Sequence, residues 1–314
     1  MSRRVTVVEV GPRDGLQNET ATLATEVKAR FVAMLADAGL GVIEVTSFVS
    51  PRAVPQLADA DMLLPLVERR AGVRYPVLVP NMRGVERARA AGADAIAVFA
   101  AASETFSQRN IGMSIDQSLS GYAEVAAAAR GDGMWVRGYV STAFGCPYEG
   151  DVDREQVARV ATSLAAVCDQ VSIGDTIGVA APDGVTAVVS RLLAELDADR
   201  LALHLHDTRG RAIENAAAGL ALGITCFDGS AAGLGGCPFA PGAPGNLATE
   251  TLVAWLHAQG IETGVDEAAL AEAAAFIRDA LATTPRCRCC GPRSWRRRAP
   301  GRPPQASPRA ACAA

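Results

Sequence analysis

The chain has 314 residues, 49% of them hydrophobic, which is enough for one large core. Its net charge of −4 and its isoelectric point near 5.5 give no reason to expect a nucleic-acid partner. No run of 18 apolar residues predicts a membrane span, and the N-terminal residues MSRRVTVVEV enter a strand-like run without a signal or transit segment. We therefore expect a cytoplasmic protein that associates with neither nucleic acid nor membrane.

Strand-like and helix-like segments alternate along the body of the chain. Expected strands cover residues 4–10, 41–47, 74–80, 95–101, 135–141, 170–176, 201–207 and 226–232. Expected helices cover residues 22–38, 54–70, 83–91, 115–130, 153–167, 183–196, 211–222 and 247–259, followed by one more at 266–282. Eight consecutive strand–helix units favour parallel strands joined by crossover helices.

Eight units are also the number that closes a (β/α)8 TIM barrel. A doubly wound open sheet is the alternative. However, the GPRDG that follows the first expected strand is not a dinucleotide-binding G-x-G-x-x-G, and the chain has no GxxxxGK[ST]. We therefore expect an α/β fold, a (β/α)8 TIM barrel with an extra C-terminal helix.

Polar residues gather where the expected strands end, which is where barrel enzymes carry their chemistry. Charged groups within barrel strands need partners, because burying one alone costs several kcal/mol. Taken singly, each residue also has a purely structural explanation, such as a helix N-cap for Asn246. Their convergence on one barrel face favours an active site. In chain order they are Arg13, Asp14, Glu44, Asp175, His204, His206, Cys237 and Asn246.

Two of the three histidines, His204 and His206, lie two positions apart in LHLHDTRG. Side chains alternate along a strand, so both imidazoles are expected to face the same side. The pair favours a metal site over two hydrogen-bonded core histidines, whereas His257 on a late helix is interpreted as a surface residue away from that face. Two histidines and a carboxylate also describe the facial triad of iron oxygenases. An added asparagine oxygen and water molecules suit Mg²⁺ or Mn²⁺ better.

The composition changes at Pro285. From there to Ala314 the chain has eight arginines, no acidic residue and four of its eight cysteines. The CRCC run does not match a zinc-binding spacing, and the cysteines as a whole do not match a disulfide scaffold, so we expect reduced thiols. Residues 285–314 are expected to be a disordered basic tail, with an interaction arm as the alternative. Residues 1–284 are expected to form the catalytic domain.

Several long motifs resemble those of the 3-hydroxy-3-methylglutaryl-CoA lyase family, a group of barrel metallolyases related to isopropylmalate synthase-like enzymes. The similarity covers roughly residues 4 to 280 and breaks at TTPRCRCCGPRSWRRR, which replaces the family's ordered C-terminal segment. The motifs are VEVGPRDGLQNE (8–19), IEVTSFVSP (43–51), RGYVSTAFGCPYEG (137–150), SIGDTIGVA (172–180), HLHDTRG (204–210) and GLGGCPFAPGAPGNLATE (233–250).

The resemblance implies a divalent-metal-dependent lyase that cleaves the acyl-CoA substrate hydroxymethylglutaryl-CoA to acetyl-CoA and acetoacetate, as in leucine breakdown and ketone-body formation. We also expect a homo-oligomer, a dimer or a tetramer. By the same resemblance the family's metal ligands correspond to Asp14, His204, His206 and Asn246. Its catalytic arginine, essential glutamate, functional aspartate and loop cysteine correspond to Arg13, Glu44, Asp175 and Cys237.

The reaction needs such residue types. A metal ion can hold the substrate's hydroxyl and carboxylate oxygens, and a guanidinium such as that of Arg13 can stabilise charge on the thioester oxygen. A thiol such as that of Cys237 can return a proton to the enolate carbon, while Glu44 and Asp175 orient a hydroxyl, a water or a ligand histidine. The alternatives are a lyase for a longer branched acyl-CoA, a Claisen-type condensing enzyme and a non-catalytic barrel subunit.

Overall fold

The computed structural model describes residues 4–236 and 245–284. All the strands within these residues belong to one parallel sheet. Their order is β2-β1-β9-β8-β7-β6-β5-β4-β3. The strands are β1 (Thr6–Glu9), β2 (Val42–Ile43), β3 (Thr46–Ser47), β4 (Val77–Leu78), β5 (Ala95–Ala101), β6 (Trp135–Ser141), β7 (Gln170–Gly174), β8 (Leu201–His204) and β9 (Cys226–Gly229).

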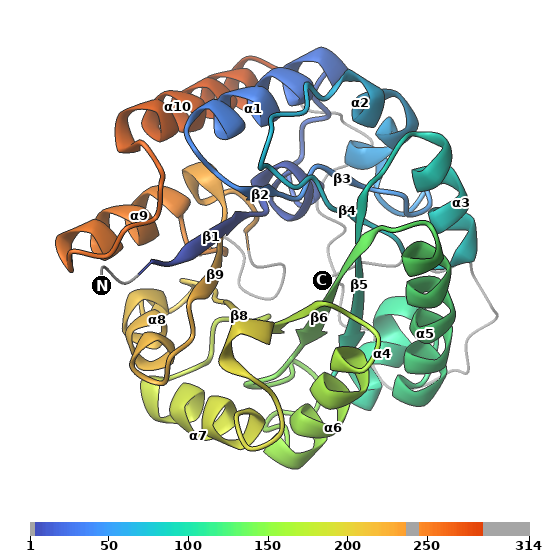
Figure 1. Cartoon of the computed structure of the whole chain (residues 1–314), viewed down its shortest axis with the longest axis vertical. Helices are drawn as coiled ribbons and strands as arrows, with labels where there is room; N and C mark the ends of the chain where they lie inside the picture. Colours follow the sequence, from blue (N-terminus) through green and yellow to red (C-terminus); the bar gives the residue numbers. More distant parts are fainter. Residues whose placement is uncertain (1–3, 237–244, 285–314) are drawn as a thin grey trace, which may run out of the picture.

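The two ends of this sheet belong to one expected strand, residues 41–47. β2 pairs with β1, and β3 pairs with β4, so the interrupted strand joins the first and last positions of the sheet. Between the halves, the Glu44 N–H donates to the Glu9 carbonyl at 2.8 Å and the Val45 N–H donates to the Pro76 carbonyl at 3.0 Å. The sheet is therefore closed, and the predicted (β/α)8 barrel is confirmed (Figure 1).

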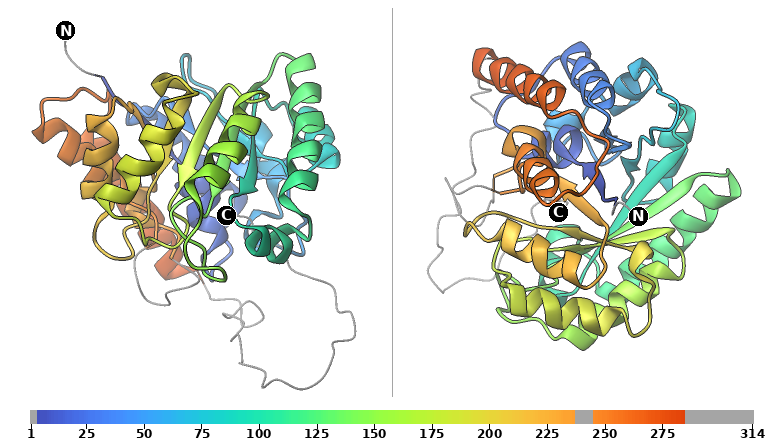
Figure 2. Two further views of the ribbon diagram at one scale, coloured as in Figure 1. Left: turned by 90° about the horizontal axis from the view of Figure 1, so that it is seen from below. Right: turned by 60° about the vertical axis from the view of Figure 1, so that its left-hand side comes forward.

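Helices surround the barrel, as the view in Figure 1 and the two further views in Figure 2 show. No described helix is both long enough and apolar enough to span a bilayer. The α-helices are α1 (Thr25–Asp37), α2 (Ala60–Leu66), α3 (Met82–Ala90), α4 (Glu104–Ile111), α5 (Ile115–Gly131), α6 (Arg154–Ala165), α7 (Pro182–Leu192), α8 (Ala212–Ala221), α9 (Thr249–Ala258) and α10 (Glu267–Thr283). Short turns lie at η1 (Gly11–Gly15), η2 (Pro55–Leu57), η3 (Ala198–Arg200) and η4 (Ala231–Gly233).

Two helices differ from the sequence-based expectation. The helix expected at 54–70 is only α2, preceded by the 3-10 turn η2, which begins at Pro55. Pro65 has no N–H to donate within the helix, and α2 ends one residue after it. The helix α4 was not expected. Its local signals are the Ser103 hydroxyl, which caps it by accepting from the Phe106 N–H, and Gly112, which ends it at φ +74°.

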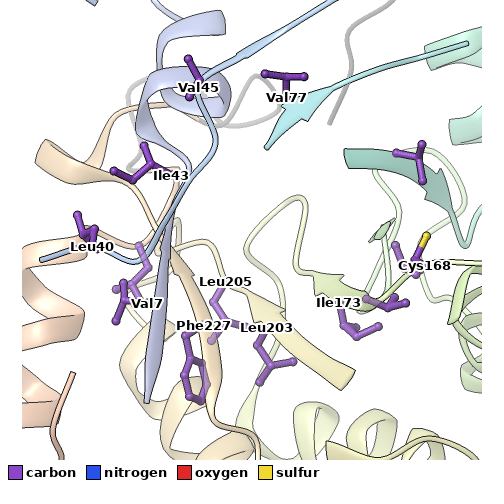
Figure 3. Packing of buried hydrophobic residues seen from close by; sticks show 14 of the residues in the cluster. Val7, Leu40, Ile43, Val45, Val77, Cys168, Ile173, Leu203, Leu205 and Phe227 are labelled. Atoms are coloured by element: carbon purple, nitrogen blue, oxygen red, sulfur yellow. The ribbon is translucent and has the colours of Figure 1, made fainter. Parts of the chain in front are cut away.

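The apolar core is a layer between the strands and the helices. This layer includes strand residues that face outward from the barrel, such as Val7, Ile173, Leu203 and Phe227 (Figure 3). The alternate residues face the barrel interior, where Tyr139 packs with Phe99. The interior also holds ion-paired side chains, so this barrel has a polar centre inside an apolar layer.

The residue before β1 and the end of α1 both contact the segment between α9 and α10. The Val5 N–H donates to the Glu262 carbonyl at 2.9 Å, and the Asp266 N–H donates to the Ala38 carbonyl at 2.8 Å. The expected extra C-terminal helix is α10, which packs beside α1 (Figure 1). The tail expected to be disordered, residues 285–314, lies outside the described residues.

Candidate metal centre and active site

The site begins in a tight turn directly after β1. The backbone N–H groups of Arg13, Asp14 and Gly15 all donate to the Val10 carbonyl, which forms the π-helical turn η1. A side chain at Gly15 would overlap Leu234, so the close approach of the two loops requires a glycine there. The turn places Arg13 and Asp14, both buried, at the end of the first strand.

Arg13 links two carboxylates of the site. Its Nε donates to Oε2 of Glu44 at 2.9 Å, and its Nη1 donates to Oδ1 of Asp14 at 2.7 Å. The Tyr139 hydroxyl donates to the same Glu44 oxygen at 3.0 Å. The other oxygen of Glu44, Oε1, is buried and has no hydrogen-bond partner among the described residues. Glu44 therefore keeps one acceptor free within the site.

The two histidines lie together at the end of β8. The strand ends at His204, and His206 lies just beyond it in an isolated antiparallel bridge with Asn246. The strand is shorter than the expected 201–207, yet the two imidazole ring centres are 5.2 Å apart. One ligand atom each of Asp14, His204 and His206 lies within 4.8 Å of the others, which is a group that can hold a metal ion.

Asn246 completes this group. Its Nδ2 donates to Oδ2 of Asp14 at 2.8 Å and to the Leu234 carbonyl at 3.0 Å. Its Oδ1 and the Nδ1 of His206 are buried and have no hydrogen-bond partner among the described residues. Buried polar atoms are normally paired, so these unpaired acceptor positions beside a carboxylate fit a divalent cation.

The charges of the site stabilise one another. Burial alone would raise the pKa of Asp14, but the Arg13 guanidinium and the adjacent His204 hold it below its ordinary value. Burial, together with the neighbouring His204, lowers the pKa of the His206 imidazole to about 3. An ionised carboxylate and a neutral imidazole are the forms that bind metal ions.

Asp175 follows β7, and its carboxylate is held by the loop that comes after it. One oxygen accepts from the Val179 N–H at 2.9 Å and the other from the Ala180 N–H at 3.1 Å. Burial raises the pKa of Asp175 to about 6, against the opposing effect of these N–H groups. Its own N–H donates to the His204 carbonyl at 2.8 Å, so Asp175 lies directly beside the histidine pair.

Two histidine or cysteine positions from the sequence analysis are not part of this group of described residues. Cys237 falls in residues 237–244, outside the described residues. His257 lies on α9, where its ring nitrogens contact Glu267 and Thr263 and not the histidine pair, as expected. His257 was expected to be a surface residue, and it is half-buried and hydrogen-bonded.

Three further residues of the barrel interior belong to the site but were not predicted from the sequence: Arg137, Tyr139 and Asp228. Arg137 donates to Oδ1 of Asp228 at 2.6 Å and to the Tyr139 hydroxyl at 2.9 Å, and the other Asp228 oxygen lies 3.2 Å from Nδ1 of His204. Burial would raise the pKa of Asp228, but Arg137 lowers it to about 2. Arg137 and Asp228 were each visible as a charged residue inside an expected strand, the signal that had singled out Glu44.

Known proteins show the same fold with closely related sequences. The HMGL-like family profile matches residues 4–277. A mitochondrial hydroxymethylglutaryl-CoA lyase of Bos taurus is 50% identical over 280 residues, covering 89% of this chain and 86% of that protein. A cytoplasmic 3-hydroxy-3-methylglutaryl-CoA lyase of Danio rerio is 51% identical over 278 residues, covering 88% and 83%.

A solved structure agrees with this relationship. The crystal structure of the HMG-CoA lyase of Bacillus subtilis superimposes with a TM-score of 0.88 at 45% sequence identity, covering 92% of this chain and 97% of that one. The family profile, the two relatives and this structure all span the barrel that carries the residues described above. The chain belongs to the HMGL-like family.

Proposed function

We propose that this chain is a carbon–carbon lyase that cleaves 3-hydroxy-3-methylglutaryl-CoA to acetyl-CoA and acetoacetate with the help of a divalent cation. The observation that carries the proposal is the group of Asp14, His204 and His206 beside the buried Arg13 at the C-terminal end of the barrel. The two relatives named above are lyases for this substrate, and their sequences are 50% and 51% identical to this chain over most of its length.

The reaction has two stages. Loss of the proton from the tertiary hydroxyl lets the adjacent carbon–carbon bond break, which releases the ketone acetoacetate and leaves the thioester enolate of acetyl-CoA. The enolate carbon then takes up a proton to give acetyl-CoA. The site must therefore accept a hydroxyl proton, stabilise negative charge on the thioester oxygen and return a proton to carbon.

Asp14, His204, His206 and Asn246 are the residues that would hold the cation. A carboxylate, an amide oxygen and two imidazoles leave room for oxygen ligands from the substrate, which favours Mg²⁺ or Mn²⁺. When bound, such an ion supplies a Lewis acid that orients the substrate's hydroxyl and carboxylate oxygens and makes the hydroxyl more acidic.

Arg13 and Glu44 act as a unit in this proposal. The Arg13 guanidinium is buried and fixed by two carboxylates, so it is preorganised to stabilise charge that develops on the thioester oxygen. The free Oε1 of Glu44 is an acceptor for the substrate hydroxyl or for a water molecule. Asp175 orients the loop beside His204, and Cys237 is the proposed proton donor to the enolate carbon.

The direct test is an activity assay. We expect the purified full-length chain with Mg²⁺ or Mn²⁺ and 3-hydroxy-3-methylglutaryl-CoA to release acetoacetate and acetyl-CoA in equal amounts. Excess chelator should abolish turnover, and restoring the cation should recover it. A folded, metal-loaded chain that forms neither product would contradict the proposal, and faster turnover of a longer branched 3-hydroxyacyl-CoA would reassign the substrate.

The expected cytoplasmic location and homo-oligomeric state stay predictions. One relative is named as mitochondrial and the other as cytoplasmic, so family membership does not select a compartment. Light scattering coupled to size-exclusion chromatography would measure the mass of the assembly directly.

A further inference from the structure

We propose that Asp228 is a positioning residue that fixes the tautomer of His204, so that the Nε2 atom of this imidazole is unprotonated and free to bind a metal ion. This inference rests on the metal site in the proposed function, and it assigns a role to a residue outside the proposed ligands. A neutral imidazole carries one proton, and only its other nitrogen can bind a metal ion.

The two residues are neighbours on adjacent strands. His204 ends β8 and Asp228 lies opposite it in β9, as register partners. Oδ2 of Asp228 lies 3.2 Å from Nδ1 of His204. A carboxylate beside a guanidinium is an acceptor only, so the proton of the pair belongs on Nδ1 of His204. The Nε2 atom then has a free lone pair.

Asp228 is itself held in place on both oxygens. Arg137 donates to Oδ1 at 2.6 Å and the Ser172 hydroxyl donates to Oδ2 at 2.9 Å. Asp228 is 2% exposed and Arg137 is fully buried. Arg137 lies on β6, three positions from β9 in the sheet, so this ion pair crosses the barrel interior. The carboxylate therefore has little freedom to turn away from His204.

The same interior network reaches a second proposed ligand. From Arg137 it continues through the Tyr139 hydroxyl to Glu44, and from Glu44 through Arg13 to Asp14. Outer partners of this kind orient metal-binding histidines and commonly change metal affinity by about 10- to 100-fold when removed. Within this network, Asp228 lies within hydrogen-bond distance of an imidazole nitrogen, whereas Tyr139 meets the His204 ring through an edge-on ring contact.

Asp228→Asn tests this role with almost no change in shape. An asparagine has one acceptor oxygen and one donor NH₂ group, and Arg137 can pair only with the oxygen. The NH₂ group then faces Ser172 and His204, where it donates to Nδ1 of the imidazole. This arrangement moves the proton of His204 to Nε2 and blocks the nitrogen that would bind the metal ion.

The first measurement is the tautomer of His204 itself. The chain has only three histidines, so ¹⁵N-histidine labelling gives a spectrum simple enough to assign with His204→Gln and His257→Gln variants. At about pH 8.5, where an ordinary imidazole is neutral, we expect the metal-free wild-type chain to carry the His204 proton on Nδ1. Asp228→Asn should carry it on Nε2. A wild-type spectrum with the proton on Nε2 overturns the proposal, even if the variant does not fold.

The second measurement is the affinity for Mn²⁺ alone, from the electron paramagnetic resonance signal of the unbound ion. We expect Asp228→Asn to weaken Mn²⁺ binding by about 10- to 100-fold. The matched control is Glu9→Gln, which removes another fully buried carboxylate, on β1, whose partners are Gly11, Ala231 and Thr249 and not a histidine. The control should keep both the tautomer and the Mn²⁺ affinity of the wild type.

Two outcomes decide between a positioning role and a structural one. A folded Asp228→Asn chain that binds Mn²⁺ within about threefold of the wild type overturns the proposal, because a lost outer partner should cost more. Equal losses in Asp228→Asn and Glu9→Gln also overturn it, since any buried carboxylate would then serve. Neither measurement uses the acyl-CoA substrate, so a chain that lacks lyase activity can still support or contradict this inference.

Discussion

Single charged residues in this barrel are held by specific partners. Arg13 contacts both Glu44 and Asp14, and Arg137 contacts Asp228. Unpaired, each of these groups would cost several kcal/mol to bury. Paired, they keep ionised side chains at fixed positions in a dry interior, which is the condition under which charges act strongly on a reacting substrate.

His206→Ala should remove a proposed metal ligand without opening the apolar layer. We expect Mn²⁺ affinity and acetoacetate formation to fall by at least about 10- to 100-fold, the cost of losing even an outer partner, with little change in Tm of the metal-free chain. The matched control is His257→Ala, which alters the histidine on α9. Wild-type Mn²⁺ affinity in His206→Ala would contradict the ligand assignment.

Glu9 gives the folded state a pH dependence that can be measured. Burial raises the pKa of its carboxyl from 4.5 to about 7, against the opposing hydrogen bonds from Thr249, Ala231 and Gly11. The folded state then holds a proton that the unfolded state releases, so stability should fall as pH rises from about 4.5 to about 7. The loss is on the order of 3 kcal/mol at most.

In Glu9→Gln this loss should disappear, because the amide is neutral at every pH. Its oxygen can accept from the Gly11 and Ala231 N–H groups, and its NH₂ group can donate to the Thr249 hydroxyl. Urea unfolding of both chains at pH 5 and pH 8 checks the prediction. It is wrong if the wild-type chain and the variant lose the same stability between these two pH values.

Cys237→Ser tests the proposed proton donor. A hydroxyl is a far weaker acid than a thiol but has nearly the same size, so kcat should fall by roughly 10²- to 10⁴-fold, the usual scale for one acid–base group, with Mn²⁺ binding unchanged. A parallel test with a thiol reagent should use the chain truncated after Thr284, which lacks the four cysteines of residues 285–314. The described cysteines, Cys146, Cys168 and Cys226, are buried, so they should not react. Unchanged kcat would remove Cys237 from the mechanism.

The sequence was sufficient to predict which residues form the candidate metal site. It was not sufficient to predict the buried ion pair that holds one of them. Asp14, His204 and His206 lie at predictable strand ends, and Asn246 closes the loop that follows the last strand. Parallel barrel strands end on one face, so these residues were expected to meet. The contact between Arg137 and Asp228 depends on which residues meet across the barrel centre. That pairing follows from the closed sheet and its register, which no local pattern in the sequence specifies.

At the scale of secondary-structure elements, the apolar strands were the most predictable part. β5 and β6 coincide with the expected strands 95–101 and 135–141. β5 is a continuous apolar run, which is typical of a buried parallel strand, and β6 is rich in aromatic and β-branched residues. The interruption between β2 and β3 and the turn η1 were not predicted. The interruption depends on hydrogen bonds to partners distant in the sequence. The turn η1 has the rare π-helical geometry.

Gly39 joins two elements that are far apart in the chain. It follows α1 with φ +93°, and a side chain there would overlap the backbone carbonyl of Gly264, which precedes α10. Gly92 has a similar φ of +82° but nothing within 4 Å of such a side chain, so it is a matched control. We expect Gly92→Ala to cost about 1 kcal/mol of stability, from the left-handed backbone alone.

Gly39→Ala should cost at least about 2 kcal/mol more, because a backbone atom must move to relieve the overlap. Midpoints of urea unfolding for the two variants give this difference. Equal destabilisation of the two chains would mean that the contact between the α1 and α10 ends adds nothing to stability.

At the scale of the whole molecule, the described barrel contains all the residues of the proposed site except Cys237, so the tail from Pro285 should be dispensable. The reason is its composition, rich in arginine and proline, which predicts too little burial to offset the entropy of ordering a chain. Truncation after Thr284 should leave kcat, Mn²⁺ affinity and Tm close to those of the full chain. A truncated chain that keeps its Tm but loses activity would show that the tail takes part in catalysis.

The contact between Asn246 and Asp14 joins residues 232 positions apart. At roughly 5–20 residues per second, a ribosome makes Asp14 about 10 to 50 seconds before it makes Asn246. For most of that interval β9, which pairs with β1 in the closed sheet, has not yet been made. The complete set of proposed ligands can therefore assemble only after Asn246 has left the ribosome, when every strand from β1 to β9 has been made.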